Sequence, residues 1–475
     1  MPFLSARATQ SPEAPALIFE GGQWTYAELD RQVNGLCAAL RERGLVCGDR
    51  LGVSLENSPF FVALIHAALR LGLTLVPLNR RLSEAERAWQ IRAAECKAVI
   101  TQPFDFSPAD DFPPCPADCP SATVFFTSGT SGQPKGALLT LAAHQAAARA
   151  SSQRLETRAG ERWLLCLPLY HIGGMSILFR ACYDGLTVIL QERFQPEETC
   201  RLLNQHSAAL VSLVPTMLYR LMPLFERGLP PVLRLILLGG AAAAPELLQK
   251  AFALNLPVAS TYGLTEACSQ VSTALPQLVR RKPGCAGAPL SGVSVRIVDA
   301  DGNSLSAGQV GEIAVSGPAL MRGYLGQPPL TGEFRTGDIG HLDADGDLWV
   351  LTRRSDLIIS GGENIYPEEV ERALLAHPAV REACVFGLPD PEWGQSVAAA
   401  VVSGEPCDAA ALIQFLRGKI AGYKVPKQIL FVEALPYTAS GKLKRAEVAQ
   451  VFDLRGQIGD LPNVAQAFGL RVENP

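Results

Sequence analysis

Short apolar segments recur at regular intervals through the middle of the chain, and longer segments with helical periodicity separate them. Their starts lie about 23 residues apart, and the intervening helix-like stretches include residues 196–204 and 245–254. Strands and helices that alternate at this spacing favour a parallel α/β architecture. The expected strands cover residues 163–167, 187–190, 210–214, 233–238 and 257–260.

The residues that follow three of these strands include glycines, and two of the three segments also carry hydroxyl groups and aromatic rings. In parallel sheets ligands bind beyond the carboxyl ends of the strands, so the residues there matter most for function. The first strand is followed by Tyr170 and His171, and the fourth is followed by three small residues, Gly239 to Ala241. The fifth is followed by Thr261-Tyr-Gly-Leu-Thr-Glu266. This composition predicts a binding site along one edge of the sheet.

The apolar pattern also predicts the domain organisation. In residues 293–350 apolar and polar positions alternate in short runs separated by turns, which is typical of antiparallel strands. A smaller α+β segment follows residue 354. In that segment we expect a helix near residues 367–376 and a strand near 383–386. The fold class is therefore α/β. An N-terminal domain of stacked α/β subdomains and a β-rich subdomain covers residues 1–354, and a C-terminal α+β domain covers residues 355–475.

Two turns in the β-rich part, residues 299–303 and 343–347, superficially resemble calcium loops. Their Gly stands fourth instead of sixth, and no Glu closes a twelve-residue loop. We therefore expect hairpin turns.

Composition narrows the class of protein. A net charge of −4 gives no electrostatic reason to expect nucleic acid as the main partner, and 48% hydrophobic residues argue against disorder. The longest apolar stretch, residues 60–78, contains His66, Arg70 and Pro77, so we expect a buried helix running into a strand and no membrane span. Twelve scattered cysteines and the absence of a secretory signal predict reduced thiols in a cytoplasmic protein.

The strongest single signal is the segment Thr127-Ser-Gly-Thr-Ser-Gly-Gln-Pro-Lys-Gly136, which follows an apolar strand over residues 122–126. Hydroxyl groups, glycine N–H groups and one lysine are the groups that a polyphosphate requires around it. The segment is not a Walker A loop, because Pro134 precedes Lys135 and a glycine follows it.

This loop resembles the phosphate-binding signature of the adenylate-forming acyl-CoA synthetases. Further segments of the chain match that family in order: Ser260–Glu266, Phe334–Asp338, Arg353–Pro367 and Pro436–Lys442. The resemblance implies an enzyme that uses ATP, Mg²⁺ and CoA. A carboxylic acid is first joined to AMP with release of pyrophosphate, and the CoA thiol then displaces AMP.

The resemblance also assigns roles to residues. Glu266 becomes the Mg²⁺ ligand beside Thr265, and Lys442 bridges the carboxylate and the α-phosphate during adenylation. Asp338 binds the ribose, and Gly239, Gly240 and Tyr262 accommodate adenine. The expected catalytic residues are Lys442, Thr265, Glu266 and His171. The expected ATP-binding residues are Thr127, Ser128, Gly129, Thr130, Ser131, Gly132, Lys135, Gly239, Gly240, Ala241, Thr261, Tyr262, Gly263, Asp338 and Arg353.

Members of the family rotate the C-terminal domain between the two steps, so the resemblance implies a mobile C-terminal domain. Ser355 stands at the hinge position, where many relatives have Asp or Lys, so the resemblance implies the position of the hinge and no role for this side chain. Gly361 and Gly362 are expected to line the passage for the pantetheine arm of CoA.

The segment from Leu167 to Arg180 bears on the choice of acid. Arg180 interrupts an otherwise apolar helix, either as a surface residue with a packed stem or as the partner of a second substrate carboxylate. The second interpretation suits an aromatic dicarboxylate, and the segment resembles that of the o-succinylbenzoate–CoA ligases of menaquinone biosynthesis. His171 would be a pocket wall or gate. Weaker candidates for substrate contacts are Ser212, Ser269, Gln270 and Thr273.

Other functions stay open at this point. The nearest are a CoA ligase for another aryl or medium-chain acid, and an adenylation enzyme that loads a carrier protein. No carrier-like Gly-Asp-Ser segment is present. A catalytically silent nucleotide-binding regulator is disfavoured by the intact Lys135, Glu266, Asp338 and Lys442. The expected partners are a small carboxylic acid, ATP and CoA, and a homo-oligomer stays open.

Overall fold

The computed structural model divides the chain into two compact units. The first comprises residues 1–80, 91–127 and 136–352, and the second comprises residues 81–90, 128–135 and 353–475. The residues that the structure describes are 3–113, 122–128, 134–243, 245–352, 357–436, 443 and 445–458.

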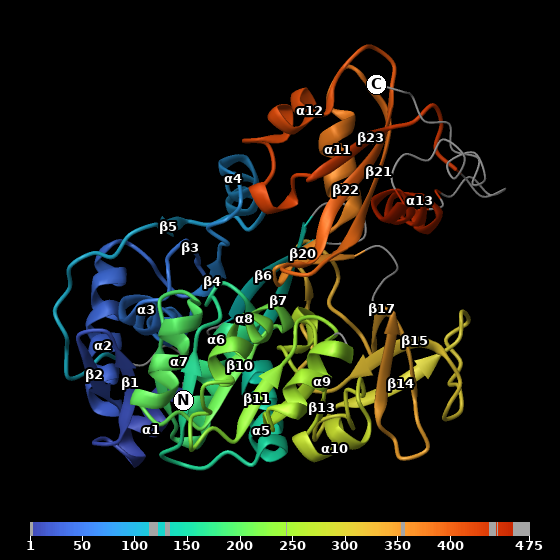
Figure 1. Cartoon of the computed structure of the whole chain (residues 1–475). Coiled ribbons are helices and arrows are strands. Elements are labelled where there is room, and N and C mark those ends of the chain that lie inside the picture. The colour runs from blue at the N-terminus through green and yellow to red at the C-terminus, as the bar shows by residue number, and fades with distance from the viewer. Residues whose placement is uncertain are drawn as a thin grey trace. The chain divides into compact units, whose positions relative to one another are not determined.

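An eight-stranded sheet forms the centre of the first unit, with the order β13-β12-β11-β10-β8-β9-β1-β2 (Figure 1). The strands from β9 to β12 run parallel, as the spacing of apolar segments predicted, and β13 and β2 are antiparallel at the two edges. Its strands are β1 (Pro15–Phe19), β2 (Gly22–Thr25), β8 (Arg162–Leu165), β9 (Thr187–Leu190), β10 (Leu210–Leu213), β11 (Leu235–Leu238), β12 (Val258–Tyr262) and β13 (Ser272–Ala274).

A six-stranded sheet has the order β16-β7-β6-β4-β3-β5. The apolar stretch over residues 60–78 forms the buried helix α3 (Pro59–Arg70) and the strand β4 (Thr74–Pro77), as expected. Ser58 caps α3 by accepting a hydrogen bond from the Phe61 N–H, and Pro59 occupies the first turn. The other strands are β3 (Arg50–Val53), β5 (Ala98–Ile100), β6 (Ala122–Ser128), β7 (Pro134–Thr140) and β16 (Gly323–Tyr324).

The β-rich part forms a four-stranded antiparallel sheet of β14 (Ser294–Val298), β15 (Gly311–Ser316), β17 (Phe334–Leu342) and β18 (Leu348–Thr352). The turn between β17 and β18 is a hairpin, as predicted. The ammonium nitrogen of Lys282 lies 2.7 Å from carboxylate oxygens of Asp343, Asp345 and Asp347. A lysine therefore occupies the position where a calcium loop holds its ion.

The second unit contains a sheet in which β20, β19, β22 and β21 are successive neighbours and β23 pairs with β22. The predicted helix and strand are present as α11 (Pro367–Leu375) and β21 (Val380–Asp390). Pro367 and two glutamates in the first turn of α11 are favourable at a helix N-terminus. The other elements are β19 (Ile358–Ser360), β20 (Glu363–Ile365), β22 (Gly394–Ser403), β23 (Gln428–Phe431), α12 (Ala409–Leu416) and α13 (Arg445–Ile458).

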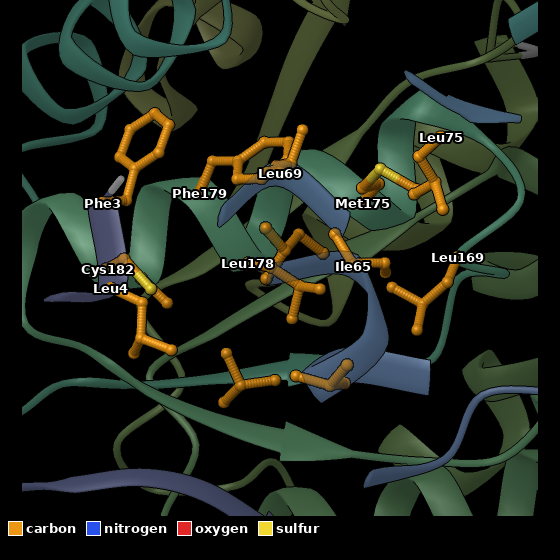
Figure 2. Close-up of a cluster of buried hydrophobic side chains, with 14 of the residues drawn as sticks. Phe3, Leu4, Ile65, Leu69, Leu75, Leu169, Met175, Leu178, Phe179 and Cys182 are labelled. Carbon is orange, nitrogen blue, oxygen red and sulfur yellow. The ribbon is translucent and has the colours of Figure 1, made fainter. Parts of the chain in front are cut away.

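Helix α6 (Ile172–Asp184) is fixed in the core of the first unit. Figure 2 shows Met175, Leu178 and Phe179 of α6 among apolar side chains that include Ile65 and Leu69 of α3, and all of them are buried. Gly185 ends the helix in the left-handed conformation with φ +76°. Tight packing of this kind restricts the helix and the polar residues that it carries.

The remaining helices include two whose bounds bear out the sequence pattern, α7 (Pro196–Gln205) and α9 (Pro245–Ala253). In the described part of the chain, no helix combines the length and apolar character needed to cross a membrane. The other helices are α1 (Phe3–Gln10), α2 (Tyr26–Glu42), α4 (Glu84–Ala93), α5 (Leu141–Leu155), α8 (Pro215–Phe225) and α10 (Pro276–Arg281).

The cysteines differ from the expectation at one position. Cys47 is disulfide-bonded, whereas the other cysteines in the described ranges are thiols. The expectation that all twelve are thiols is therefore wrong. Burial raises the pKa of the Cys166 and Cys182 thiols to about 12, which favours their protonated form.

Candidate active site

The predicted ligand loops of the first unit lie along one edge of the eight-stranded sheet. Strands β8, β10, β11 and β12 are parallel neighbours, so their carboxyl ends meet at that edge. His171 follows β8, Gly239 follows β11, and Thr265 follows β12. The structure therefore brings together residues that are nearly 100 positions apart in the sequence.

Tyr262 and Asp338, which were predicted to contact adenine and ribose, are direct partners. The buried Tyr262 hydroxyl donates a hydrogen bond of 2.6 Å to Oδ2 of Asp338. The backbone N–H of Asp338 donates to Oγ1 of Thr336, whose own hydroxyl donates to the carbonyl of Ile313. Asp338 is thus held in one orientation at the end of a short chain of hydrogen bonds.

Two glycines at this edge are required by close packing. A Cβ at Gly239 would lie 2.7 Å from Cγ2 of Thr261, and a Cβ at Gly263 would lie 1.5 Å from the carbonyl oxygen of Ser269. Gly240 has φ +83°, which L side chains rarely adopt, and Ala241 follows it. Packing against Thr261 and Ser269 therefore already favours glycine at positions 239 and 263.

Glu266 lies in a single 3₁₀ turn, Thr265–Ala267, and other elements hold its carboxylate. The Tyr324 hydroxyl donates to Glu266 Oε1 at 2.7 Å, and the Thr127 hydroxyl donates to the same oxygen at 3.3 Å. Tyr324 was not among the predicted site residues. It stands in the two-residue strand β16, and no motif in the sequence marks it.

The fit of Glu266 to Mg²⁺ can be judged from these contacts. Mg²⁺ is commonly bound through one or two carboxylates together with phosphate oxygens. The Glu266 carboxylate is fixed through one oxygen by two neutral donors and is not engaged in an ion pair with a described residue. Its negative charge is therefore available to a cation, and the residue fits the role.

Arg180 is a buried cation without an anionic partner among the described residues. The residue is 2% exposed, so the alternative of a surface arginine is wrong. Its Nη2 donates to Oγ of Ser269 at 3.3 Å, whereas its Nε is buried without a hydrogen-bond partner. Burial lowers the pKa of the Arg180 guanidinium to about 9. A buried charge in this state is costly unless a ligand compensates it.

Ser269 has an unusual backbone conformation that places it against Arg180. Its φ is +94°, and the preceding Cys268 has φ +51°. Non-glycine residues are rarely found there, and such strain is often kept at functional sites. The backbone N–H of Ser269 donates to the carbonyl of Leu264, which closes the loop after Glu266.

The remaining substrate candidates belong to three separate hydrogen-bonded groups of polar side chains. Ser151 donates to Oε1 of Gln270 at 2.6 Å, and Gln270 Nε2 donates to Oγ1 of Thr273 at 2.9 Å. The hydroxyls of Thr273 and Thr261 lie 2.9 Å apart. Trp163 Nε1 donates to Oγ of Ser212 at 3.2 Å. The first group comprises Ser151, Thr261, Gln270 and Thr273, the second is the Trp163–Ser212 pair, and the third is the Arg180–Ser269 pair described above.

His171 marks the start of α6 at the carboxyl edge. It is half-buried, it is the N-cap residue of the helix, and its ring lies 4.7 Å from that of Tyr170. Its side chain makes no capping hydrogen bond to the helix. This geometry suits a wall or gate of the acid site.

The predicted residues of the second unit are only partly within the described ranges. Gly361 and Gly362, with φ +60° and +84°, form the two-residue turn between β19 and β20. A Cβ at Gly361 would lie 2.8 Å from the Trp393 ring, so packing alone already requires glycine there. Ser128 ends β6 and Lys135 lies at the start of β7. The predictions for Gly129, Thr130, Ser131, Gly132, Arg353, Ser355 and Lys442 lie outside the described residues.

Comparisons with known proteins agree along most of the chain. A family model described as AMP-binding enzyme matches residues 4–120 and 105–325, and the model of the AMP-binding enzyme C-terminal domain matches residues 369–442. The 2-succinylbenzoate–CoA ligase of Bacillus licheniformis is 40% identical over 470 residues, which cover 93% of this chain and 98% of that protein.

Two solved structures of the o-succinylbenzoate CoA synthetase of Bacillus subtilis are similar. A double mutant bound to a product analogue has a TM-score of 0.87 at 36% identity and covers 94% of this chain and 97% of that one. The complex with ATP and magnesium ion has a TM-score of 0.70 at 36% identity and covers 94% and 98%.

Proposed function

The chain belongs to the AMP-binding enzyme family, and we propose that it ligates o-succinylbenzoate to CoA with consumption of ATP. In the first step a carboxylate oxygen of the acid attacks the α-phosphorus of ATP, and pyrophosphate leaves. In the second step the CoA thiol attacks the acyl carbon of the adenylate, loses its proton, and displaces AMP. The product is o-succinylbenzoyl-CoA, an intermediate of menaquinone biosynthesis, and the proposed location is the cytoplasm.

Arg180 is the observation that carries the choice of acid. A monocarboxylic acid has its one carboxylate consumed in the reaction and leaves a buried guanidinium uncompensated. A dicarboxylate brings a second anion, and the planar guanidinium matches carboxylate geometry. Arg180 Nε has no hydrogen-bond partner in the described part of the chain, so this donor is available to the second carboxylate. The 40% identical relative named as a 2-succinylbenzoate–CoA ligase supports the same choice.

The position of Arg180 along α6 also suits an elongated acid. His171 is the N-cap residue of α6 at the carboxyl edge of the sheet. Arg180 follows nine residues later, about 14 Å along the helix axis. Helical side chains lean toward the helix N-terminus, which brings the guanidinium back toward that edge. One carboxylate would meet the nucleotide near His171 while the other meets Arg180 at greater depth.

The nucleotide residues would act by positioning and by neutralising charge. Asp338, preoriented by Tyr262, accepts hydrogen bonds from the ribose hydroxyls, while the backbone at Gly239 and Gly240 approaches adenine. Glu266 would hold Mg²⁺, which supplies positive charge to the phosphates when it is bound. Both substrates are anionic, so these contacts lower the barrier mainly by overcoming repulsion.

The proposal extends to residues beyond the described first unit. Lys442 would bridge the reacting carboxylate and the α-phosphate in the first step, and Lys135 with the hydroxyls of the Thr127–Gly136 loop would bind the outer phosphates. Arg353 would lie near the ribose. Ser355 would be the hinge for a rotation of the C-terminal domain, and Gly361 and Gly362 would then line the passage of CoA.

Pyrophosphate release tests this proposal. Purified protein is assayed with ATP and Mg²⁺, with and without CoA, against o-succinylbenzoate, 4-oxo-4-phenylbutanoate, benzoate, 4-coumarate and octanoate. The second acid has the carbon skeleton of the first without the ring carboxylate, so it isolates the contribution of that group. CoA-supported turnover that strongly prefers o-succinylbenzoate is expected. Preference for a monocarboxylic acid would contradict the substrate and retain the enzyme class.

A further inference from the structure

We infer that Trp163 is a positioning residue that holds Arg180 and Ser212 in place for the second carboxylate of the substrate. The inference rests on the proposed function and concerns the same site. Trp163 does not follow from the signature motifs of the sequence, and it lies within strand β8, away from the loops at the carboxyl edge.

The sheet places Trp163 and Ser212 on one face. Strands β8 and β10 are parallel neighbours in which Trp163 is opposite Leu210. Side chains alternate along a strand, so Ser212, two residues after Leu210, shares the face of Trp163. That face belongs to the core that contains α6, whereas Leu164 and Val211 belong to the core on the other face.

The indole ring limits the freedom of the Arg180 side chain. The guanidinium carbon lies 5.6 Å from the centroid of the Trp163 ring, and Trp163 has no exposed surface. Among the described residues the guanidinium has one hydrogen bond, to Ser269, and it is long at 3.3 Å. A flexible arginine with so few polar contacts depends on its apolar surroundings for its position. A tryptophan face in a desolvated site is the strongest of the aromatic cation partners.

The indole N–H of Trp163 restricts the hydrogen bonds that the Ser212 hydroxyl can make. The group is a donor only, so its 3.2 Å contact with Oγ of Ser212 uses one of the acceptor sites of that oxygen. The hydroxyl hydrogen of Ser212 is then directed to another acceptor, such as a carboxylate oxygen. Trp163 therefore contacts both a cation, the Arg180 guanidinium, and a neutral donor, the Ser212 hydroxyl. Together these two groups suit one carboxylate.

The test uses Trp163→Phe, which keeps an aromatic ring and removes the N–H. Steady-state constants are measured with o-succinylbenzoate and with 4-oxo-4-phenylbutanoate. We expect the preference of the enzyme for o-succinylbenzoate over its monoacid analogue to fall roughly 5- to 30-fold, the size of one hydrogen bond and part of a cation–π contact. The loss is expected in KM for o-succinylbenzoate, with KM for ATP unchanged.

Two further variants separate positioning from packing. Phe225→Leu removes a buried aromatic ring from the core on the other face of the sheet, and it is expected to lower stability without changing the preference between the two acids. Ser212→Ala, a small change that provides a test even where Trp163→Phe folds poorly, is expected to weaken o-succinylbenzoate binding. In the Trp163→Phe background its effect should be smaller, because the two groups act together.

The outcomes distinguish the two proposals. A wild-type enzyme with no preference for o-succinylbenzoate over 4-oxo-4-phenylbutanoate would overturn the proposed function. A wild-type enzyme with that preference, together with a Trp163→Phe variant that loses activity equally for both acids, would assign Trp163 to the core alone and overturn the inference. Additive effects of Trp163→Phe and Ser212→Ala would also overturn it.

Discussion

The Tyr262 hydroxyl lies 2.6 Å from Oδ2 of Asp338, and this hydrogen bond joins two different sheets. Tyr262 ends β12 in the eight-stranded sheet, and Asp338 lies in β17 of the antiparallel sheet. The carboxylate that the resemblance assigns to ribose is thus oriented by the residue assigned to adenine. The two contacts to one nucleoside are therefore coupled through the protein.

Tyr262→Phe tests this coupling. The change removes the hydroxyl and keeps the ring, so Asp338 loses an oriented donor while the apolar contacts remain. We expect KM for ATP to rise about fivefold, the size of one hydrogen bond, with little change in KM for the acid. Steady-state kinetics with each substrate varied in turn measure both KM values. A rise in KM for the acid alone would contradict the assignment.

Arg180 is expected to lower the stability of the unliganded protein and to favour binding of o-succinylbenzoate. Arg180→Met removes a buried charge that has no anionic partner in the described residues and keeps much of the side-chain volume. The unliganded variant should melt at a temperature higher by roughly a few degrees, while KM for o-succinylbenzoate rises roughly 10- to 100-fold. Differential scanning fluorimetry and kinetics measure the two effects. Arg180→Lys is the matched control, because it keeps the charge without the planar fork.

The Glu266 carboxylate and its donors give a prediction about Mg²⁺. Glu266→Gln removes the charge and should lower the rate of adenylate formation about 10²- to 10³-fold. Tyr324→Phe removes only one donor, so we expect a smaller loss, seen as a requirement for more Mg²⁺ at half-maximal rate. Titration of Mg²⁺ at fixed ATP distinguishes the variants. An unchanged Mg²⁺ dependence in both would exclude Glu266 as the ligand.

Lys442 is predicted to serve only the first half-reaction. Lys442→Ala should reduce adenylate formation from acid and ATP about 10²-fold or more, because the positive charge that bridges the two anions is lost. Thioester formation from synthetic acyl-adenylate and CoA should be much less affected. Single-turnover assays of the two steps make the comparison. Equal losses in both steps would show that the lysine has a different role.

The Asp343 turn gives a prediction about pH. Partial burial favours protonated Asp343, but hydrogen bonds from Lys282, Trp349 and the backbone outweigh it and hold the pKa of this carboxyl well below its usual range. A lowered folded pKa gives stability that is present above the unfolded value, about 3.9, and is lost as the pH falls below it.

Lys282→Met removes the cation that three aspartates share. We expect a lower melting temperature than the wild type at pH 7, because the carboxylates then repel one another, and a difference that shrinks below about pH 4 as they become protonated. Melting temperatures at a series of pH values from 7 down to about 2.5 provide the test. A difference that stays constant over this range would show that Lys282 contributes packing and not charge.

The sequence by itself determined the elements and the chemistry of the loops. The five parallel strands, α3 with β4, and α11 with β21 follow from apolar periodicity, which reflects which faces become buried. The glycines at 239 and 263 were found because close backbone packing and ligand approach both exclude a side chain. These properties depend on residues that are close in the sequence, so they can be predicted from the sequence pattern.

Only the tertiary structure decided which side chains meet. The surface and ligand interpretations of Arg180 were equally compatible with its place in an apolar helix, and burial between α6 and β8 separated them. Tyr324 reached Glu266 from a strand 58 residues away, and Trp163 joined Arg180 to Ser212 across two elements. Contacts of this kind depend on sheet order and strand register. Neither is set by local periodicity, because each arises from the packing of the whole unit.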